Sequence, residues 1–554
     1  MAFQYLESLI VEPDLDGDDE SDIEVEPLDS SDSEDESDNR PSTSASTEKN
    51  NENWSDDLTN VTVEEFTEYS GPVHDLPPDS EPLDYFKLFF TDGLIDMIVL
   101  ETNKYAEQQQ VSKGQRDPYW KPVTADDIYK YIYTLIVFGL HPFPEIRLYW
   151  SSDPFWRVSA IADVWGRQRF QKVHQYLHMN DNTEQPARGA QNFDPLYKVR
   201  PILDHIRSTA STVYKPMQKI SVDEAMIAFT GQISFRQYIK NKPTPWGFKV
   251  WCCAEASTGY LLNFQVYTGK HNDTAHQGQG LGSRVVQNMI QGHLGKNHKV
   301  YFDNFFSTVG LAQDLLRNNT YCCSTIRPNR KEWPLPKDTK QKAGEVKMKQ
   351  KGNLVAVQWT DKRQVNVLST CCDPTMTTVQ RRKKGGGLLD VPIPSAIVDY
   401  NSAMFGVDLN DQYRSYYGVG RPGNKWWRYL FNYLIQISII NSFILMKRAR
   451  TEDNRYSISQ NHLMFRTALA KALATPSKSR AAEAPTLGGA ARAYSPEHTL
   501  AKMPGRKRRC FQCARDGNKM PSGRTRETIT GCPLCNVHLH GGPCYLKFHE
   551  ALKQ

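Results

Sequence analysis

The sequence predicts a multidomain α+β protein, and three observations lead to that prediction. First, 554 residues are too many for a single hydrophobic core. Second, charge is divided unevenly, because residues 1–57 carry a charge of −18 and the remaining 497 residues carry +22. Third, apolar residues follow a helical spacing up to about residue 216 and form strand-like runs after Lys219.

The N-terminal region, residues 1–82, is predicted to be disordered. It is acidic and serine-rich, as in Ser30-Ser-Asp-Ser-Glu-Asp-Glu-Ser37, and it holds too few apolar groups to offset the entropy of ordering. The basic remainder favours a polyanionic partner. The acidic region is therefore either a solvating tail or a phosphorylatable arm that competes with DNA for the basic part of the chain.

Residues 83–216 are predicted to be all-helical. Apolar residues recur at helical spacing in Tyr85–Phe90 and Leu94–Ala106, and Thr124 caps a further apolar helix over 128–137. A helix over 167–178 carries several basic side chains. These charges either face DNA or form an ordinary solvated surface.

After Lys219 the elements follow the plan of an RNase H-like sheet. A hairpin is predicted from Gly247–Cys253 and Tyr260–Tyr267, around the turn at 257–259. A helix, the strand Lys299–Phe302, a second helix and the strand Thr320–Ile326 follow. Three antiparallel strands, then helix, strand, helix and strand, are typical of that fold. In this plan Asp223 on the first strand and Asp303 after the fourth lie side by side, although 80 residues separate them.

Residues 327–384 interrupt this plan and are predicted to be a small β insertion. Two strand-like pieces lie over 354–359 and 364–370. The basic run Arg381-Arg-Lys-Lys384 is either a nuclear-localisation or phosphate-binding patch or a flexible charged linker. Adjacent cysteine pairs, in strand-like runs, are interpreted as packing thiols; they are Cys252-Cys253, Cys322-Cys323 and Cys371-Cys372.

The run Tyr429–Met446 is long enough to cross a membrane. Its polar residues Asn432, Gln436 and Asn441 favour a buried core helix instead, so no membrane partner is expected.

Three carboxylates from distant parts of the chain predict a divalent-metal site. Asp223 and Asp303 end strand-like runs, and Asp408 stands at a helix start with Asp411 on the same face at i+3. Mg²⁺ takes hard oxygen ligands and few carboxylates, which leaves room for water and phosphate. Two such ions can clamp the attacking and leaving oxygens of an in-line displacement, so the acids indicate phosphoryl chemistry.

The C-terminal 45 residues carry a strong zinc signature, because paired Cys-x2-Cys units are followed by a His/Cys series. Eight candidate ligands would fill two sites in a cross-braced module. They are Cys510, Cys513, Cys532, Cys535, His538, His540, Cys544 and His549. His538 and His540 lie too near each other in the sequence to decide between them.

Taken together, these pieces resemble the piggyBac-type transposases and their domesticated vertebrate derivatives. The resemblance runs from about Tyr85 to His549. It is carried by Tyr85-Phe-Lys-Leu-Phe-Phe90 with Glu101-Thr-Asn103, Gln237-Tyr-Ile-Lys-Asn-Lys-Pro243 with Trp246-Gly-Phe-Lys249, Thr258-Gly-Tyr260 with Tyr267-Thr-Gly-Lys270, Tyr301-Phe-Asp-Asn-Phe-Phe-Ser307, Gly406-Val-Asp408 with Asp411-Gln412, Asn441-Ser-Phe443 and the Cys-rich end.

The resemblance implies that Asp223, Asp303 and Asp408 bind catalytic Mg²⁺ or Mn²⁺, with Asp411 a supporting acid. It also implies an aromatic residue, Trp426 or Trp427, that stacks on flanking DNA, the alternative being a core tryptophan. In the C-terminal module, His540 stands where relatives often carry Cys, a change that Zn²⁺ tolerates. Further DNA contacts are predicted at Lys240, Lys242, Arg381, Arg382, Lys383 and Lys384.

The function implied by the resemblance is cut-and-paste DNA transposition in the nucleus by a homodimer. Transposon ends would be nicked, closed as hairpins, reopened and joined at TTAA targets, with scarless excision. The alternative is a domesticated DNA-binding protein without this activity. The three intact acids favour the enzyme.

The resemblance and the composition together predict eight segments. They are a disordered acidic region (1–82), a helical dimerisation and DNA-binding domain in two parts (83–216 and 418–472), an RNase H-like catalytic domain in two parts (217–326 and 385–417), an insertion (327–384), a linker (473–506) and a zinc-binding domain (507–551).

Overall fold

The computed structural model divides the chain into two compact units, residues 1–475 and 476–554, which we describe separately. The structure describes residues 53–240, 242–269, 280–336, 341–382, 386–450 and 457–475 of the first unit. In the second it describes 500–503, 507–518, 520, 526–532, 535, 537–541 and 543–550. Most of the predicted disordered region therefore lies outside the described residues.

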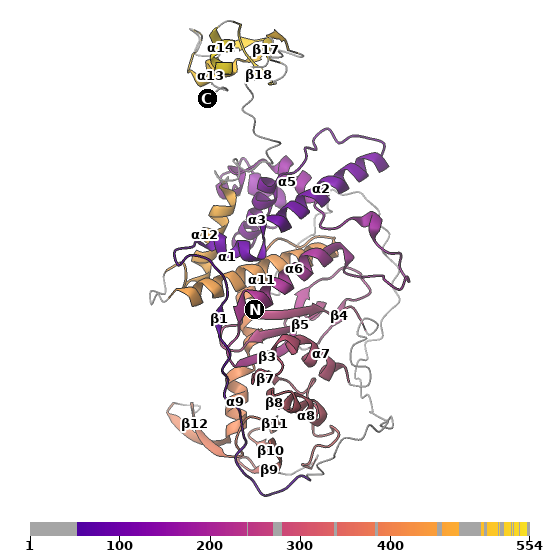
Figure 1. The fold of residues 1–554 in the computed structure, drawn as a ribbon, viewed down its shortest axis with the longest axis vertical. Coiled ribbons are helices and arrows are strands. Elements are labelled where there is room, and N and C mark those ends of the chain that lie inside the picture. Colours follow the sequence, from indigo (N-terminus) through magenta and orange to yellow (C-terminus); the bar gives the residue numbers. More distant parts are fainter. Residues whose placement is uncertain are drawn as a thin grey trace. The chain divides into compact units, whose positions relative to one another are not determined.

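A nine-stranded mixed sheet forms the centre of the first unit, in the order β4-β5-β3-β7-β8-β11-β10-β9, with β6 also paired to β5 (Figure 1). Its first part is β3 (Lys219–Ala228), β4 (Gln237–Tyr238), β5 (Trp246–Glu255), β6 (Leu261–Val266), β7 (Lys299–Phe302) and β8 (Tyr321–Thr325). Strands β3, β5 and β6 are antiparallel, and β7 and β8 continue parallel to β3.

The connections agree with the sequence prediction. Helix α7 (Leu281–Ile290) leads from β6 to β7, and α8 (Val309–Arg317) leads from β7 to β8. Thr308 caps α8 by accepting a hydrogen bond from the Leu311 N–H at 3.0 Å. The predicted order of three antiparallel strands, helix, strand, helix and strand is thus confirmed.

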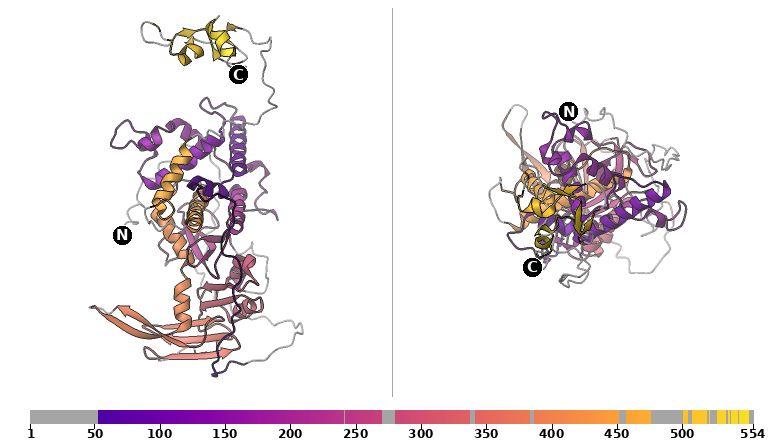
Figure 2. Two further views of the ribbon diagram at one scale, coloured as in Figure 1. Left: turned by 60° about the vertical axis from the view of Figure 1, so that its left-hand side comes forward. Right: turned by 90° about the horizontal axis from the view of Figure 1, so that it is seen from above.

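The segment predicted as an insertion is not a separate sheet. Strands β9 (Val346–Lys351), β10 (Leu354–Thr360) and β11 (Gln364–Ser369) extend the central sheet, because β11 pairs with the edge strand β8. Beyond them, β12 (Met376–Arg382) and β13 (Leu388–Pro394) form a two-stranded ribbon that extends away from the sheet (Figures 1 and 2). The linker interpretation is therefore wrong for Arg381 and Arg382, whereas Lys383 and Lys384 lie outside the described residues.

Helices from both flanks of the sheet pack together, as predicted (Figure 1). They are α1 (Pro82–Phe89), α2 (Asp92–Ser112), α3 (Ala125–Leu140), α4 (Ser159–Ala162), α5 (Arg167–Tyr176), α6 (Arg200–Thr212), α11 (Trp426–Ala449) and α12 (His462–Ala474). The predicted cap is present, because Thr124 and Asp127 form a reciprocal capping box at the start of α3. Two further helices, α9 (Ser395–Ala403) and α10 (Gly406–Tyr416), connect the ribbon to this group.

Helix α11 is the one described helix that is long and apolar enough to cross a membrane, but 89% of its apolar window is buried inside the fold. Its polar side chains Gln436 and Asn441 form hydrogen bonds with backbone groups outside the helix. Asn441 accepts from the Leu261 N–H at 3.0 Å and donates to the Leu261 carbonyl at 2.9 Å, so it acts as a hydrogen-bonding neighbour for the outer strand β6. The predicted core helix is confirmed.

Residues 53–73, which we call the N-terminal strap, correct the prediction of disorder for that stretch. The strap is extended and holds to the sheet mainly through backbone and amide hydrogen bonds rather than apolar burial. Ser55 forms a bridge with Gln350, and Asn353 exchanges bonds with Thr62. Its far end pairs β1 (Gly71–Pro72) with β2 (Tyr214–Lys215).

The second unit is small and has few regular elements. Its helices are α13 (Phe511–Arg515) and α14 (Pro543–Glu550), and its strands are β14 (Ala501–Lys502), β15 (Arg508–Arg509), β16 (Glu527–Thr528), β17 (Thr530–Cys532) and β18 (Val537–His538). A buried cluster of Cys510, Cys513, Cys532, Leu539 and Tyr545 is its core. Such a small apolar core needs cross-linking by metal or disulfide.

Replacing Asn441 with Leu is expected to destabilise the first unit by about 2–4 kcal/mol, because the Leu261 N–H and C=O each lose a buried partner. Thermal unfolding of the full chain should show a Tm lower by several degrees. Lys447→Leu, at an exposed position on the same helix, is the control and should leave the Tm unchanged. Equal Tm values for the two variants would contradict this role of Asn441.

Candidate active site

Asp223 and Asp303 are brought together by the parallel pairing of β3 and β7. Val222 is the register partner of Phe302, so the next residue on each strand is one of the two acids. Neighbouring positions in register share a face of a sheet. Asp303 is fixed at the end of β7, where its Oδ1 accepts a hydrogen bond from the Phe305 N–H at 2.8 Å.

Asp408 reaches the same place because α10 lies directly on β3. At Gly406 a Cβ atom would come within 2.4 Å of Ser221 Oγ, so only glycine permits this approach. Further along the helix, Arg414 donates to the Met226 carbonyl at 3.2 Å. Between these anchors, in the first turn of α10, Asp408 lies along the stretch of β3 that carries Asp223.

The predicted supporting acid, Asp411, has a specific partner. Arg414 Nη1 lies 2.6 Å from Asp411 Oδ1, and the Arg414 guanidinium stacks on the Tyr433 ring of α11. Arg414 thus links the middle of α10 to Met226 of β3 and to Tyr433 of α11, and Asp411 orients its guanidinium. Asp411 therefore supports the helix that carries Asp408.

The acids affect one another electrostatically. Burial, followed by the charge of Glu224, raises the pKa of Asp223 well above its usual range. Burial also raises the pKa values of Asp303 and Asp408. Glu224 contributes to all three shifts, and the sequence analysis did not single it out, although it directly follows Asp223.

Lys242 lies among these carboxylates. Its Nζ is 3.2 Å from Glu224 Oε1, and the charges of Asp223, Glu224 and Asp408 all raise its pKa. An ammonium held by several carboxylates shows that the site attracts positive charge. The oxygen-only set of Asp223, Asp303 and Asp408 fits Mg²⁺ or Mn²⁺.

The second unit contains two groups of candidate metal ligands. Cys510, Cys513, His540 and Cys544 form one, and Cys532, Cys535 and His549 form the other; within each group the ligand atoms lie within 4.8 Å of one another. The groups alternate along the chain, which is the predicted cross-braced arrangement. Cys513 Sγ lies 3.5 Å from both His540 Nδ1 and Cys544 Sγ, a separation that suits tetrahedral Zn²⁺.

The histidine ambiguity is resolved by contacts. His538 belongs to neither group among the described residues. Its Nδ1 lies 3.1 Å from the Thr528 carbonyl. Seven of the eight predicted ligands therefore fall into the two groups, and the role of His538 stays a prediction. His540 and His549 have their second ring nitrogens near carbonyls, at 3.3 Å from Glu527 and 2.8 Å from Tyr545, as metal-binding imidazoles usually do.

Comparison with known proteins identifies the family. A protein-family model described as Transposase IS4 matches residues 81–443 of this chain. The human PiggyBac transposable element-derived protein 5 is 25% identical to this chain, over 74% of this chain and 79% of its own length. The human PiggyBac transposable element-derived protein 2 is 28% identical, over 66% of this chain and 61% of its own length. The chain belongs to the piggyBac-type transposase family.

The fold agrees with this family. A solved piggyBac transposase synaptic complex with hairpin DNA has a TM-score of 0.64 and 23% identity, covering 86% of this chain and 99% of that one. The described α+β arrangement is therefore that of a piggyBac-type protein.

The predicted DNA-contact residues have different environments in this piggyBac-type chain. Trp427 is 3% exposed and packs near the His178 ring, so the core interpretation applies to it; Trp426 is partly exposed and packs edge-on against Phe235. Arg381 is paired with Asp361 at 2.8 Å, and Lys242 with Glu224. Lys240 and Arg382 are exposed.

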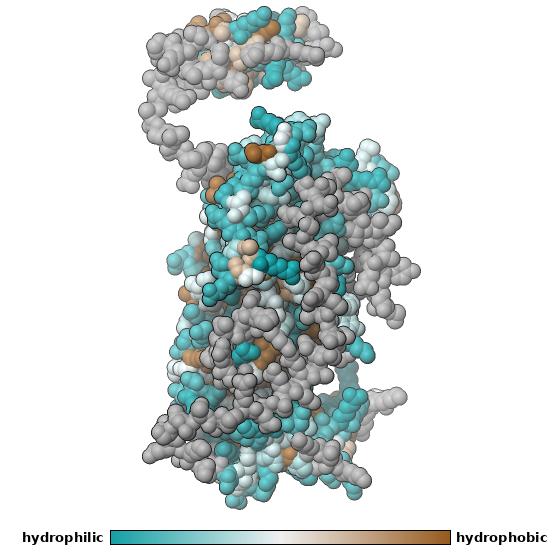
Figure 3. All heavy atoms as spheres, turned by 90° about the vertical axis from the view of Figure 1, so that its right-hand side faces the viewer, coloured by the Kyte–Doolittle hydropathy of each residue, from teal (hydrophilic) through white to brown (hydrophobic). Residues whose placement is uncertain are grey.

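On the face seen in Figure 3 the described surface is mainly hydrophilic.

His540→Ala is expected to lose one zinc ion per chain, because it removes a ligand from the first group. His538→Ala, two residues away, should keep the full complement, since this side chain lies outside both groups. Native mass spectrometry of the full chain counts the bound ions. Loss of zinc from the His538 variant, or retention by the His540 variant, would reverse the ligand assignment.

Proposed function

We propose that the protein is an active piggyBac-type DNA transposase. The observation that carries this proposal is the register of β3 and β7, which places Asp223 and Asp303 at neighbouring positions of the central sheet, together with the packing of α10, the helix that carries Asp408, against β3. Membership in the family supplies the reaction class. The strand order from β6 through β5, β3, β7 and β8 supports an RNase H-like core.

The proposed roles of the residues follow from their positions. Asp223, Asp303 and Asp408 would hold Mg²⁺ or Mn²⁺, which supplies charge stabilisation and an activated water in strand cleavage. Lys242 and Glu224 balance charge beside these ligands. Arg414, paired with Asp411 on the same helix, joins α10 to β3 through the Met226 carbonyl, so that Asp408 keeps its position relative to the strand acids.

Double-stranded DNA is the proposed substrate and partner. The chain outside residues 1–57 carries a charge of +22, and its solved structural neighbour was determined with hairpin DNA. We extend the proposal to hairpin formation at transposon ends, joining at TTAA sites with scarless excision, and action as a nuclear homodimer. The seven-ligand Cys/His module would bind two Zn²⁺ ions and contribute to recognition of the ends.

A second candidate is a DNA-binding protein that has lost transposition, as a domesticated derivative would. The relatives named above support it, because their names describe them as derived from transposable elements. Against it stands the presence of all three acids, two of them at neighbouring positions of β3 and β7. The two candidates differ in one measurable property, cleavage of DNA.

An excision assay in cells tests the proposal. With the repeats that flank its coding sequence placed around a reporter, the wild-type protein is expected to restore an uninterrupted TTAA site. Asp303→Asn should reduce excision to background, because the oxygen ligand becomes a neutral amide. DNA binding by this variant should persist, because the phosphate contacts are made by basic residues.

The variant Asp314→Asn tests whether a lost carboxylate at any position impairs the protein, because Asp314 is partly exposed and forms an ion pair with Arg317 on the same helix, α8. It should excise as well as the wild type does. Specific end binding without any excision by the wild-type protein would favour the second candidate. Full excision by Asp303→Asn would show that this acid is not a catalytic ligand.

A further inference from the structure

Lys249, on β5, is a lysine held between aromatic rings. Its Nζ lies 3.9 Å from the centre of the Trp251 ring and 4.9 Å from the centre of the Phe305 ring. The two rings are themselves stacked, with centroids 5.7 Å apart and planes at 21°. The ammonium therefore lies against two π faces, in a place that is only partly open to solvent.

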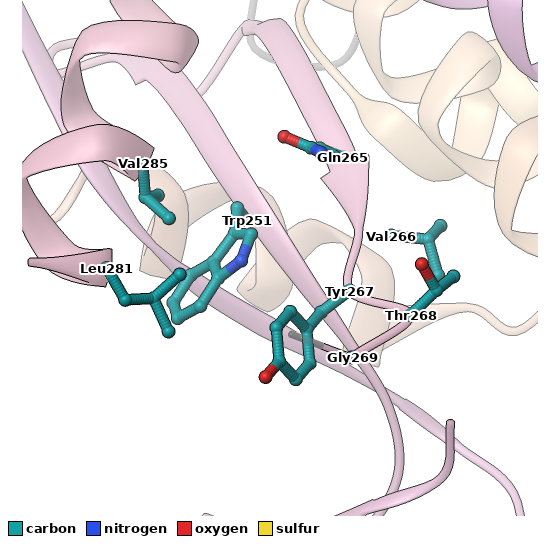
Figure 4. Close-up of a pocket in the computed structure, with 8 residues that line it drawn as sticks. All are labelled: Trp251, Gln265, Val266, Tyr267, Thr268, Gly269, Leu281 and Val285. Carbon is teal, nitrogen blue, oxygen red and sulfur yellow. The ribbon is translucent and has the colours of Figure 1, made fainter. Parts of the chain in front are cut away.

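The position of this ammonium is well determined by packing. Trp251 is 2% exposed and touches Phe306 and Tyr267 edge-on. Figure 4 shows its ring between Tyr267 and the α7 side chains Leu281 and Val285. The ring on which the Lys249 ammonium lies is therefore held in place by its neighbours.

Lys249 lies beside the candidate active site. Phe305, which contacts the ammonium, donates its backbone N–H to Asp303 at 2.8 Å. The charges of Glu224, Asp223 and Asp303 all act on Lys249, yet burial outweighs them and leaves the pKa of its ammonium below the usual range. The lysine is thus near the acids without being neutralised by them.

Among the described residues, no carboxylate lies within ion-pair distance of the Lys249 ammonium, and no side chain or carbonyl accepts a hydrogen bond from it. Lys242, a few residues earlier, differs in both respects, because it pairs with Glu224 at 3.2 Å and donates to the Glu224 carbonyl. A partly buried cation without a counterion is costly. The acids of the described residues act on this ammonium only from beyond ion-pair distance, which points to an anion from outside the chain.

We propose that Lys249 is a phosphate-binding residue that contacts a backbone phosphate of DNA next to the bond that is cleaved. The inference rests on the proposed function, because it needs DNA at the acid cluster. The inference adds one specific contact to the proposed function. The acids and Lys249 would bind neighbouring parts of the same DNA strand. A compact ammonium on a rigid platform suits a single phosphate oxygen better than a base edge.

The proposal predicts an unusual combination of properties for Lys249→Met, which keeps the length of the side chain but removes the charge. Cleavage of a duplex bearing the flanking repeats should fall at least tenfold at saturating DNA. The Tm of the free protein should stay the same or rise, because an uncompensated charge is removed. A purely structural lysine, valued for its ring contacts, would instead lower the Tm when replaced.

Salt dependence supplies a readout that a structural role would not change. The slope of log binding constant against log salt concentration, measured with a mixed-sequence DNA duplex, should become shallower by about one unit in Lys249→Met. Lys249→Arg keeps the charge and should retain the wild-type slope and part of the cleavage. Lys447→Met, exposed at the end of α11, is the matched control and should match the wild type in slope, cleavage and Tm.

Two results would overturn the proposal: wild-type slope and cleavage in Lys249→Met, or lost cleavage together with a lowered Tm and an unchanged slope. Its failure can be separated from failure of the proposed function. If the wild-type protein cleaves no DNA but Lys249→Met still has the shallower slope, the phosphate contact stands and the transposase proposal fails. If the wild type cleaves and Lys249→Met behaves identically, the transposase proposal stands and the phosphate contact fails.

Discussion

The approach of α10 to β3 is the constraint on which the candidate site depends. Three carboxylates repel one another, so they converge only where packing forces them to. Gly406 lets the helix lie against Ser221, and Arg414, paired with Asp411 on the same helix, donates to the Met226 carbonyl further along the strand. The apolar helix α11 closes the far side through Tyr433. The energy that holds the acids together thus comes from a core built around them.

The same core explains how the outer elements are held. Asn441 of α11 completes the hydrogen bonding of Leu261, so the outermost antiparallel strand does not need another strand beside it. On the opposite side, β11 pairs with β8 and moves the exposed edge of the sheet outward to β9. The sheet is therefore protected by a helix on one side and by additional strands and the N-terminal strap on the other.

Much of the fold could be predicted from the sequence, because buried strands such as β3 and β7 contain short apolar runs, each followed directly by an acid. The strap and the β12–β13 ribbon could not, since they are held by hydrogen bonds with little apolar burial, and their composition matches that of loops. Spacing alone could not separate His538 from His540, because the fold decides which of the two side chains faces the cysteine thiols. Glu224 and Lys249 were missed for a related reason: a sequence shows charges but not which of them are paired.

The strap also bears on the order in which the chain acquires its structure during synthesis. Thr59 of the strap donates its backbone N–H to Gln350, and the Tyr85 carbonyl of α1 accepts a hydrogen bond from Ser442. Both partners leave the ribosome hundreds of residues later. Strands β3 and β7 can pair well before α10 exists, whereas Asp408 joins them only when the later helix has docked. A nascent or truncated chain therefore carries two of the three acids without the third. The site can therefore be assembled only after α10 has been synthesised and has docked on β3.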